Sequence, residues 1–406
     1  MKRIAIIGAG AAGTFCATLL RRSLPDARID IYEAGEKPLA KVAVTGGGRC
    51  NLTNTFEGIG DISEAYPRGH RLMKRLFRVF DHGTCQSWFE AEGVRLTIQE
   101  DHCIFPESQD AMEIVETLLR GCRGCTIHCS TRVESIRPDG EGFILGLREK
   151  PQAKADIVVV TTGGIPRGSS FLRELDLQME DPVPSLFTFS IQDPVTEMMG
   201  TVVEAVVSLP GTKFRAGGPL LITDWGMSGP AILKLSSYAA RHLAEKQYRT
   251  PLAVNWIGGS EDDARALLAS LAKGNERKLI VSVHPDAIPS RLWTYLSAKS
   301  GLRADMRWGE IGKTGLNRFV NTLVNDSYQV SGKTRFKDEF VTCGGISLAE
   351  VGAGTMESKR YPGLYFAGEV LDIDAITGGF NLQAAWTTGF AAAQAIIDSY
   401  ERGTDN

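Results

Sequence analysis

Residues 4–13 read Ile4-Ala5-Ile6-Ile7-Gly8-Ala9-Gly10-Ala11-Ala12-Gly13, an apolar run that meets three glycines in the spacing Gly-x-Gly-x-x-Gly. The apolar run predicts a strand, and the residues from 14 to 22 predict a helix. In such a unit Gly8 permits the tight turn, Gly10 lets a pyrophosphate approach the backbone, and Gly13 lets helix and strand pack closely. This stretch therefore predicts a dinucleotide-binding α/β unit. The alternative is an α/β turn that binds no ligand.

A second predicted strand, residues 28–32, ends at an acid, Glu33. Glu33 follows Gly13 by about 20 residues, the spacing at which a carboxylate holds the ribose hydroxyls of a dinucleotide. A carboxylate there argues against a 2′-phosphate. At the start of the first helix, backbone amides face the phosphates, so Ala9, Ala11 and Ala12 are also predicted cofactor contacts.

Length and composition favour a multidomain protein that binds a small molecule. The chain has 406 residues, 43% of them hydrophobic, which is enough for a large core and two or three domains. Its net charge of −3 gives no basic footprint for nucleic acid or an anionic membrane. No apolar run reaches the roughly 18 residues that cross a bilayer, and glycines interrupt the only run resembling a signal peptide. We expect a soluble, cytoplasmic protein with no membrane or nucleic-acid partner.

The eight cysteines do not predict a disulfide scaffold in a chain of this length. Cys122 and Cys125 superficially resemble a metal or redox pair. However, alternation places Cys125, Ile127 and Cys129 on one strand face, and no second pair has matching spacing. We expect packed thiols and no metal.

A second glycine-rich segment, residues 46–54, reads Gly-Gly-Gly-Arg-Cys-Asn-Leu-Thr-Asn. Consecutive glycines allow a concave backbone whose amides bind an anion or accept a flat ring at close range. A flexible surface loop is the alternative. The polar detail after the glycines favours a loop that faces the cofactor.

This segment closely resembles the signature of the HI0933-like bacterial flavoproteins, also called the YhiN/BaiN or aminoacetone oxidase family. The resemblance implies an α/β fold with FAD in a discontinuous domain of two dinucleotide folds, similar to glutathione reductase. Residues 126–136 and 142–147 alternate like two strands, and they resemble the β-meander of this family. In the first half of the chain the resemblance adds the following expected FAD contacts: Lys41, Gly47, Gly48, Arg49, Cys50, Asn51 and, in that meander, Val133.

Three later segments extend the predicted cofactor site. Residues 155–164 form an apolar strand that ends in a glycine turn, and residues 363–369 form a strand that ends in a glycine-acid pair. Residues 378–383 open the terminal helix, whose first amides would lie near the flavin ring. A buried helix that starts at glycine and packs on the first strand is the alternative for this last segment. The expected contacts here are Thr162, Gly163, Gly164, Gly368, Glu369, Gly379, Asn381 and Leu382.

Between these segments the pattern changes to short alternating runs, which predict a small β-barrel or sandwich. Ser228 is placed to cap a helix over residues 231–244. Asp224 stands where the family usually has histidine, so proton transfer is not carried over to this position. Three predicted helices, 261–272, 289–300 and 314–324, form a helical insert, which Ser260 opens.

We therefore expect a discontinuous FAD domain (1–186 and 336–406), a β-barrel-like domain (187–257 and 322–335) and a helical insert (258–321). The expected function is that of an FAD-dependent oxidoreductase acting on a small organic substrate where the barrel meets the helices. Relatives suggest oxidation of a small amine, or reduction of an unsaturated carbonyl compound by NAD(P)H that visits the flavin transiently. Alternatives are a flavin-dependent RNA-modifying enzyme and a non-catalytic FAD-binding redox sensor. The sequence assigns no acid, base or oligomeric state.

Overall fold

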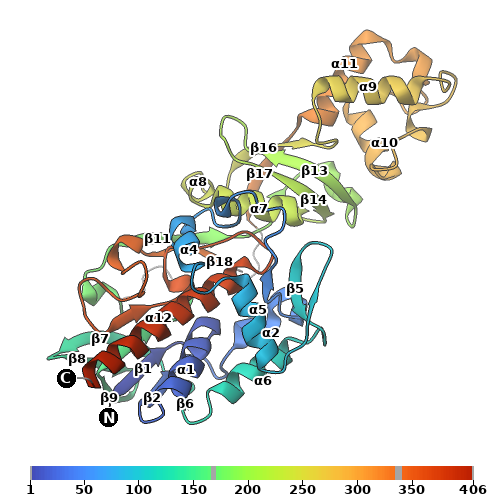
Figure 1. Ribbon diagram of the computed structural model, residues 1–406. Helices are drawn as coiled ribbons and strands as arrows, with labels where there is room; N and C mark the ends of the chain where they lie inside the picture. Colours follow the sequence, from blue (N-terminus) through green and yellow to red (C-terminus); the bar gives the residue numbers. More distant parts are fainter. Residues whose placement is uncertain (1, 166–170, 334–340, 405–406) are drawn as a thin grey trace. The chain divides into compact units, whose positions relative to one another are not determined.

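The computed structural model describes residues 2–165, 171–333 and 341–404 (Figure 1). The chain divides into two compact units, the first made of residues 1–183 and 341–406 and the second of residues 184–340. The place where the chain is expected to return to the first unit, residues 334–340, lies outside the described residues. The further division of the second unit into barrel and helical domains stays a prediction.

A five-stranded sheet forms the centre of the first unit, in the order β19-β10-β1-β2-β6. All neighbours in this sheet are parallel. Every residue of β10 is buried, as expected for a strand covered on both faces. The strands are β1 (Arg3–Ile7), β2 (Arg28–Tyr32), β6 (Thr126–His128), β10 (Ile157–Val160) and β19 (Leu364–Phe366).

Helices α1 (Ala11–Ser23) and α12 (Phe380–Thr404) lie beside each other in this unit (Figure 1). A Cβ on Gly389 would lie 2.9 Å from the Ala12 carbonyl oxygen, so the two helices approach closely. The other elements of this unit are α2 (Ala40–Gly48), β3 (Thr53–Asn54), α3 (Ile62–Ala65), α4 (His70–Leu76), α5 (His82–Ala91), β4 (Leu96–Ile98), β5 (Cys103–Pro106), α6 (Ala111–Gly121), β11 (Met179–Ser185) and β18 (Val341–Ile346).

The prediction of one continuous strand over residues 126–136 is wrong. β6 ends at His128 and belongs to the parallel sheet, whereas β7 (Val133–Asp139) forms an antiparallel meander with β8 (Gly142–Leu147) and β9 (Lys150–Ala155). Between them the Thr131 amide donates to the Glu33 carbonyl at 2.7 Å. This bond ties residues 129–132 to the end of β2, so the chain turns where alternation alone predicts that it continues.

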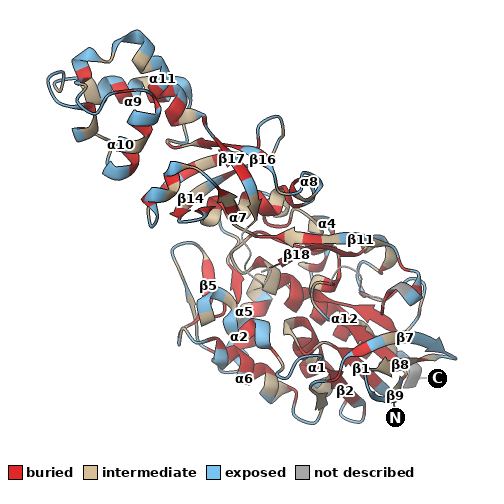
Figure 2. Ribbon diagram, turned by 180° about the vertical axis from the view of Figure 1, so that it is seen from behind, coloured by how far each residue is buried: buried red, intermediate tan, exposed pale blue. Residues whose placement is uncertain are grey.

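Six strands of the second unit form a closed barrel, in the order β12-β15-β14-β13-β16-β17, as predicted. The helical segment lies in the sequence between the last two of these strands, β16 and β17. One hydrophobic cluster contains barrel residues such as Leu252 and helical-segment residues such as Trp293 and Phe319; Figure 2 shows buried residues on both parts. The elements are β12 (Phe189–Ile191), β13 (Val202–Ser208), β14 (Arg215–Thr223), β15 (Gly226–Ser228), α7 (Pro230–Tyr238), α8 (Ala240–Glu245), β16 (Thr250–Asn255), α9 (Glu261–Ala272), α10 (Ser290–Lys299), α11 (Gly312–Val324) and β17 (Asp326–Lys333).

Helix starts in this unit confirm one prediction and correct another. Ser260 and Asp263 form the reciprocal capping box that opens α9. Ser228, in contrast, lies within β15 and caps nothing; the N-cap of α7 is Gly229, at φ +87°, with no side-chain capping bond. The predicted helix 231–244 is also divided at Ala239. Among the helices that the structure describes, none is both long and apolar enough to cross a membrane.

Candidate cofactor site

Four parallel strands of the first unit end at the same edge of the sheet, and each is followed by residues that the sequence predicts to contact the cofactor. β1 leads to Gly8, β2 to Glu33, β10 to Gly163 and β19 to Gly368. The strand order places β1 between β2 and β10, where the chain reverses its direction of winding. Ligands of open α/β sheets bind outside the carboxyl ends of the strands at this point. The fold therefore brings together segments that are far apart in the sequence.

The three glycines of the first turn occupy three different environments. Gly8 has φ +106°, and a Cβ there would lie 2.5 Å from the Thr161 carbonyl oxygen. A Cβ on Gly13 would lie 2.1 Å from the Gly8 carbonyl oxygen, so only glycine lets helix and strand approach. A Cβ on Gly10 would meet nothing within 4 Å. The open space at Gly10 leaves room for the pyrophosphate that the sequence predicts there.

The start of α1 has the character of an anion site. Its N-cap is Gly10, no side chain caps it, and its first turn carries no acidic residue. The first amides of the helix, those of Ala11, Ala12 and Gly13, thus keep the partial positive charge that attracts phosphate. These residues fit a dinucleotide.

Glu33 is held in a fixed orientation at the end of β2. Its Oε2 accepts from the Ala9 amide at 2.8 Å and its Oε1 from the Gly35 amide at 2.7 Å. Each carboxylate oxygen can accept more than one hydrogen bond, so both remain able to accept from ribose hydroxyls. Val133, the first residue of β7, is buried and follows closely after Thr131, whose amide donates to the Glu33 carbonyl.

The segment of consecutive glycines leaves the helical conformation at the end of α2, as expected of a loop. In α2, Thr45 is extended and Gly46, Gly47 and Gly48 have φ of +57°, +71° and +82°. Cβ atoms on Gly47 and Gly48 would meet nothing within 4 Å. Three left-handed residues in succession produce a concave backbone, and glycine alone adopts this conformation without strain.

Arg49 lies over the face of the Phe105 ring, with 4.4 Å from its guanidinium carbon to the ring centroid. Its Nε donates to the Gly46 carbonyl at 3.1 Å. These contacts fix an exposed cation beside the glycine turn. Lys41, also exposed, lies in the first turn of α2, with its Nζ 3.6 Å from Glu369 Oε2.

Cys50 is fully buried and packs in a cluster with Leu52, Phe89 and Trp386. Burial raises the pKa of its thiol to about 12. At physiological pH the thiol is neutral, so its position indicates packing rather than nucleophilic or redox chemistry.

Iodoacetamide at pH 8 is therefore expected to leave Cys50 unmodified in the folded protein, because only the thiolate attacks the reagent. Half-buried Cys129 serves as the internal control and is expected to be alkylated first. Peptide mass spectrometry of native and urea-unfolded samples measures both thiols. Rapid modification of native Cys50 would contradict its assignment as a packed thiol.

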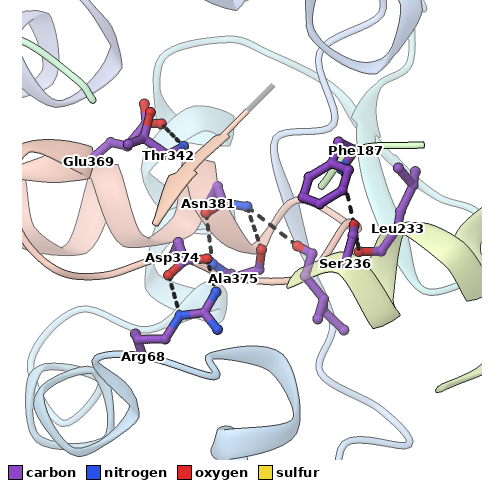
Figure 3. A network of polar contacts seen from close by, with 10 residues as sticks. Arg68, Phe187, Leu233, Ser236, Thr342, Glu369, Asp374, Ala375 and Asn381 are labelled. Atoms are coloured by element: carbon purple, nitrogen blue, oxygen red, sulfur yellow. Dashed lines mark hydrogen bonds and ion pairs between the residues drawn. The ribbon is translucent and has the colours of Figure 1, made fainter. Parts of the chain in front are cut away.

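Glu369 follows β19 and lies close to two other segments of the chain, one at Thr342 and one at Gly163. Its Oε1 accepts from the Thr342 amide at 2.7 Å (Figure 3), and a Cβ on Gly163 would lie 3.5 Å from its Oε2. Gly164 is required for this approach, since a Cβ there would lie 2.2 Å from Thr342 Oγ1. Thr162 is exposed at the same turn, and the neighbouring Thr161, which the sequence did not single out, donates to the Gly8 carbonyl at 2.8 Å.

The start of α12 is fixed by hydrogen bonds to residues 51–66. Tyr66 donates to the Phe380 carbonyl at 2.8 Å, and Asn54 Nδ2 donates to the Gly378 carbonyl at 3.2 Å. In the amide orientation that satisfies both of its groups, Asn51 donates to the Thr53 carbonyl at 3.0 Å and accepts from Gly379 N at 3.3 Å. The residues that follow the glycine turn 46–48 are thus bonded directly to the start of α12.

The Asn381 side chain binds the protein itself. Its Oδ1 accepts from the Ala375 amide at 2.9 Å and its Nδ2 donates to the Ala375 carbonyl at 3.1 Å (Figure 3). Asn381 therefore shapes the loop before α12, and the predicted contact of its side chain with the cofactor stays a prediction. Leu382, the next residue, packs on the same cluster as Cys50.

An ion pair that the sequence analysis missed supports this loop. Asp374 is completely buried, and Arg68 Nε donates to its Oδ1 at 2.6 Å while Arg68 Nη2 donates to its Oδ2 (Figure 3). Such a two-pronged contact holds both groups in one geometry. The available signal was a pair of acids, Asp372 and Asp374, in the otherwise apolar stretch that leads to Gly378 and Gly379.

A buried line of polar side chains on α12 was also missed. Thr53 Oγ1 donates to Gln383 Oε1 at 2.5 Å, and Gln383 Nε2 donates to Thr387 Oγ1 at 3.0 Å. Trp386 Nε1 donates to the Leu52 carbonyl at 3.0 Å. These bonds hold residues 52–53 against the terminal helix.

Other candidate groups do not assemble into a site. Asp224 is exposed in the turn between β14 and β15 of the second unit. Within residues 2–165, 171–333 and 341–404, no group of three or more His, Cys, Asp or Glu side chains is placed to hold a metal ion. Cys122 and Cys125 are both free thiols.

Comparison with known proteins finds a family and relatives that match nearly the whole chain. The family model described as HI0933-like protein Rossmann domain matches residues 2–395. A protein of Escherichia coli K12 named ribosomal RNA dihydrouridine synthase is 28% identical, with 97% of each chain covered. A Clostridium scindens protein named 3-dehydro-bile acid delta(4,6)-reductase is 27% identical, over 98% of this chain and 100% of that one. Among solved structures, the FrdA chain of E. coli quinol fumarate reductase superposes with a TM-score of 0.49 at 16% identity, over 98% of this chain and 71% of that one.

Proposed function

Because the chain belongs to the HI0933-like family of FAD-dependent oxidoreductases, we propose that it reduces a carbon–carbon double bond conjugated to a carbonyl group. The observation that carries this proposal is the chemistry common to the names of two relatives, each matched over nearly the whole chain. Making dihydrouridine adds two hydrogens to the double bond of uracil, which is conjugated to a carbonyl. A Δ4,6 double-bond system beside a 3-oxo group is conjugated in the same way.

The substrate class we propose is therefore an α,β-unsaturated carbonyl compound, either a uracil base or a small enone. The balanced reaction takes a hydride from a reduced nicotinamide and a proton from solvent, and yields the saturated carbonyl compound and the oxidised nicotinamide. We propose transient docking for the nicotinamide, because the sequence carries only one full Gly-x-Gly-x-x-Gly motif. FAD, when bound, would supply the redox chemistry that links the nicotinamide to the substrate.

The residues described above have separate parts in this proposal. Glu33 would hold the ribose, the α1 amides beside Gly10 would hold the pyrophosphate, and Gly47 and Gly48 would let the flavin approach the backbone. The first amides of α12 would stabilise negative charge on the reduced ring, since the N-terminal end of a helix carries partial positive charge. This helix start would be kept in place by Asn381, Tyr66 and the Arg68–Asp374 pair. The amides would then need no movement to face the charge that develops during the reaction.

The test follows the flavin absorption band in two anaerobic steps. NADH or NADPH is expected to bleach the purified yellow protein. Addition of 2-cyclohexenone is then expected to restore the band and yield cyclohexanone, whereas cyclohexanone itself, which has no double bond, is the matched control and should restore nothing. In a parallel sample, an unlabelled RNA rich in uridine replaces 2-cyclohexenone, and dihydrouridine is measured by mass spectrometry of the nucleosides.

Three outcomes would contradict the proposal. Bleaching by small amines with no reaction toward enone or uridine would indicate an amine oxidase. Bound flavin that neither nicotinamide reduces would indicate a redox sensor. Reoxidation by oxygen alone, with no saturated product from either substrate, would exclude the proposed reductase.

A further inference from the structure

Helix α4 and the turn after it present a basic face in the first unit. Residues 71–80 alternate between buried apolar positions, including Leu72, Met73 and Leu76, and exposed positions. The exposed positions are Arg71, Lys74, Arg75, Arg78 and Val79. The helical spacing of three and four residues gathers the four cations on one side. We call these four cations the α4 basic face.

The cations of this face are electrostatically unpaired. None of the four forms an ion pair with the carboxylates in the described part of the chain. Lys74 acts on the exposed Asp61 only through space, as one of several causes that lower the pKa of that carboxyl. Elsewhere in this unit exposed arginines do bind acids, as Arg95 binds Glu107 at 3.1 Å. Four cations without an ion pair are thus concentrated in one short stretch, residues 71–78.

The basic face also borders a hollow. A cavity of about 710 Å³ is lined by Arg71, Lys74, Arg75, Leu76, Arg78, Val79 and Gly354. The lining contains no acidic residue. A Cβ on Gly354 would lie 3.6 Å from Arg75 Nη2, so the absence of a side chain there leaves room beside the guanidinium.

This face is connected to the candidate cofactor site through the residue pairs at the start of α4. Gly69, at φ +80°, packs against Ile373, with only 2.7 Å from an added Cβ to the Ile373 side chain. The preceding Arg68 binds the buried Asp374, six residues before Phe380, the first residue of α12. A polyanion on the basic face would therefore lie on the element that braces the α12 start.

We propose that the α4 basic face binds the phosphate backbone of an RNA substrate, so that one of its uridines can reach the cofactor site. This inference rests on the proposed function, because uracil is one of the two substrate types of that reaction. Arginine and lysine bind phosphates, and unpaired cations lose no existing ion pair when they do so. A membrane surface fits less well, since Val79 is the one exposed apolar residue on this face and interfacial helices need an apolar side to insert.

The proposal also accounts for why net charge is a poor guide here. A charge of −3 over the whole chain coexists with four unpaired cations between residues 71 and 78. Phosphate contacts depend on the local field, which falls off within about 8–10 Å at ordinary salt concentrations. The expectation of no nucleic-acid partner, drawn from the net charge, therefore does not extend to this surface.

The test measures RNA binding separately from turnover. FAD-loaded protein is titrated into a fluorescein-labelled, uridine-containing RNA hairpin, and anisotropy gives the affinity at several salt concentrations. The test variant carries R71Q, K74Q, R75Q and R78Q. The matched control removes four exposed, unpaired cations of the second unit, through K273Q, R277Q, K278Q and K313Q. Both changes lower the formal net charge by four, from −3 to −7.

We expect the test variant to bind the hairpin about 100-fold more weakly at low salt, with the slope of log affinity against log salt reduced by about 3. The control is expected to keep both values near those of the unmodified protein. A third variant, R71K with R75K and R78K, should retain the slope because it retains the charges. Unchanged FAD content and melting temperature show that the test variant is folded.

The proposal is overturned if the test variant binds RNA as the unmodified protein does, or if the control loses as much affinity. Binding to vesicles of equal parts phosphatidylserine and phosphatidylcholine, without binding to RNA, would overturn it in favour of a membrane. Reoxidation of the reduced flavin by 2-cyclohexenone should be equal in all variants. Failure of that reaction in every variant would contradict the reductase proposal. The anisotropy comparison would still show whether the α4 basic face binds RNA.

Discussion

Replacing Gly10 by valine is expected to abolish FAD retention and to leave the fold intact. Gly10 has φ −84°, which valine tolerates, and its missing side chain faces open space. The added methyl groups would therefore enter the volume assigned to the pyrophosphate without disturbing the apoprotein. The absorption spectrum and flavin content of purified G10V measure the loss, and circular dichroism with thermal unfolding measures the fold. We expect the flavin-to-protein ratio to fall by at least about 100-fold, which corresponds to a loss of about 2.7 kcal/mol in binding.

Two glycine variants provide the contrast. G332V changes another glycine without left-handed backbone and with nothing within 4 Å, and it should keep its flavin. G13A places a Cβ 2.1 Å from the Gly8 carbonyl oxygen, so it should lower the stability of the first unit as well as flavin content. Full flavin retention by G10V would show that the cofactor lies elsewhere. Unfolding of G10V would show that the space at Gly10 is not open.

Arg68→Met is expected to lower the free energy of unfolding of the first unit by about 3–5 kcal/mol, the largest stability effect that we predict. The substitution leaves the carboxylate of Asp374 buried without the two-pronged contact that Arg68 provides. Because Asp374 precedes the α12 start, flavin retention should decrease together with stability. Urea unfolding of the cofactor-free protein, followed by hydrogen exchange at α12 amides, measures the change within this unit.

A pair of controls separates the buried charge from the loss of packing. R95M removes an exposed arginine whose partner Glu107 is also exposed, and should cost no more than about 1 kcal/mol. The double variant R68M with D374L removes both charges, so it should be more stable than R68M alone. If R68M is as stable as R95M, the ion pair does not brace the loop. If the double variant is no more stable than R68M, the loss of stability comes from changed packing rather than from the buried charge.

The sequence could predict the first turn of the fold because its chemistry is local. Gly8, Gly10 and Gly13 belong to one short motif, and the structure shows a matching environment for each, although the atom that crowds Gly8 is the carbonyl oxygen of the distant Thr161. Glu33 could be found because parallel strands end at one edge, which converts sequence spacing into proximity. The small barrel was predictable from alternation, and the Ser260 cap from a capping pattern that involves only four residues.

The predictions that were wrong depend on contacts between distant segments. Alternation over residues 126–136 could not reveal that the Thr131 amide bonds to the Glu33 carbonyl. The Ser228 prediction overlooked that β15 extends through this residue, which leaves Gly229 as the N-cap. Arg68 and Asp374 are separated by 306 residues, and no periodicity relates them. The unpaired state of the α4 cations is likewise a tertiary property that a sum of charges conceals.

The central sheet has a consequence for the order in which the protein is made. β10 ends at Val160, yet its neighbour β19 begins at Leu364, after the whole second unit. While the ribosome synthesises the intervening residues, the four apolar residues of β10 form an open strand edge, a template for pairing with other chains. FAD capture must also wait, because α12 is translated later still. The nascent protein therefore passes through a long interval in which it is exposed to aggregation, and chaperone binding or rapid docking of β19 would set its yield.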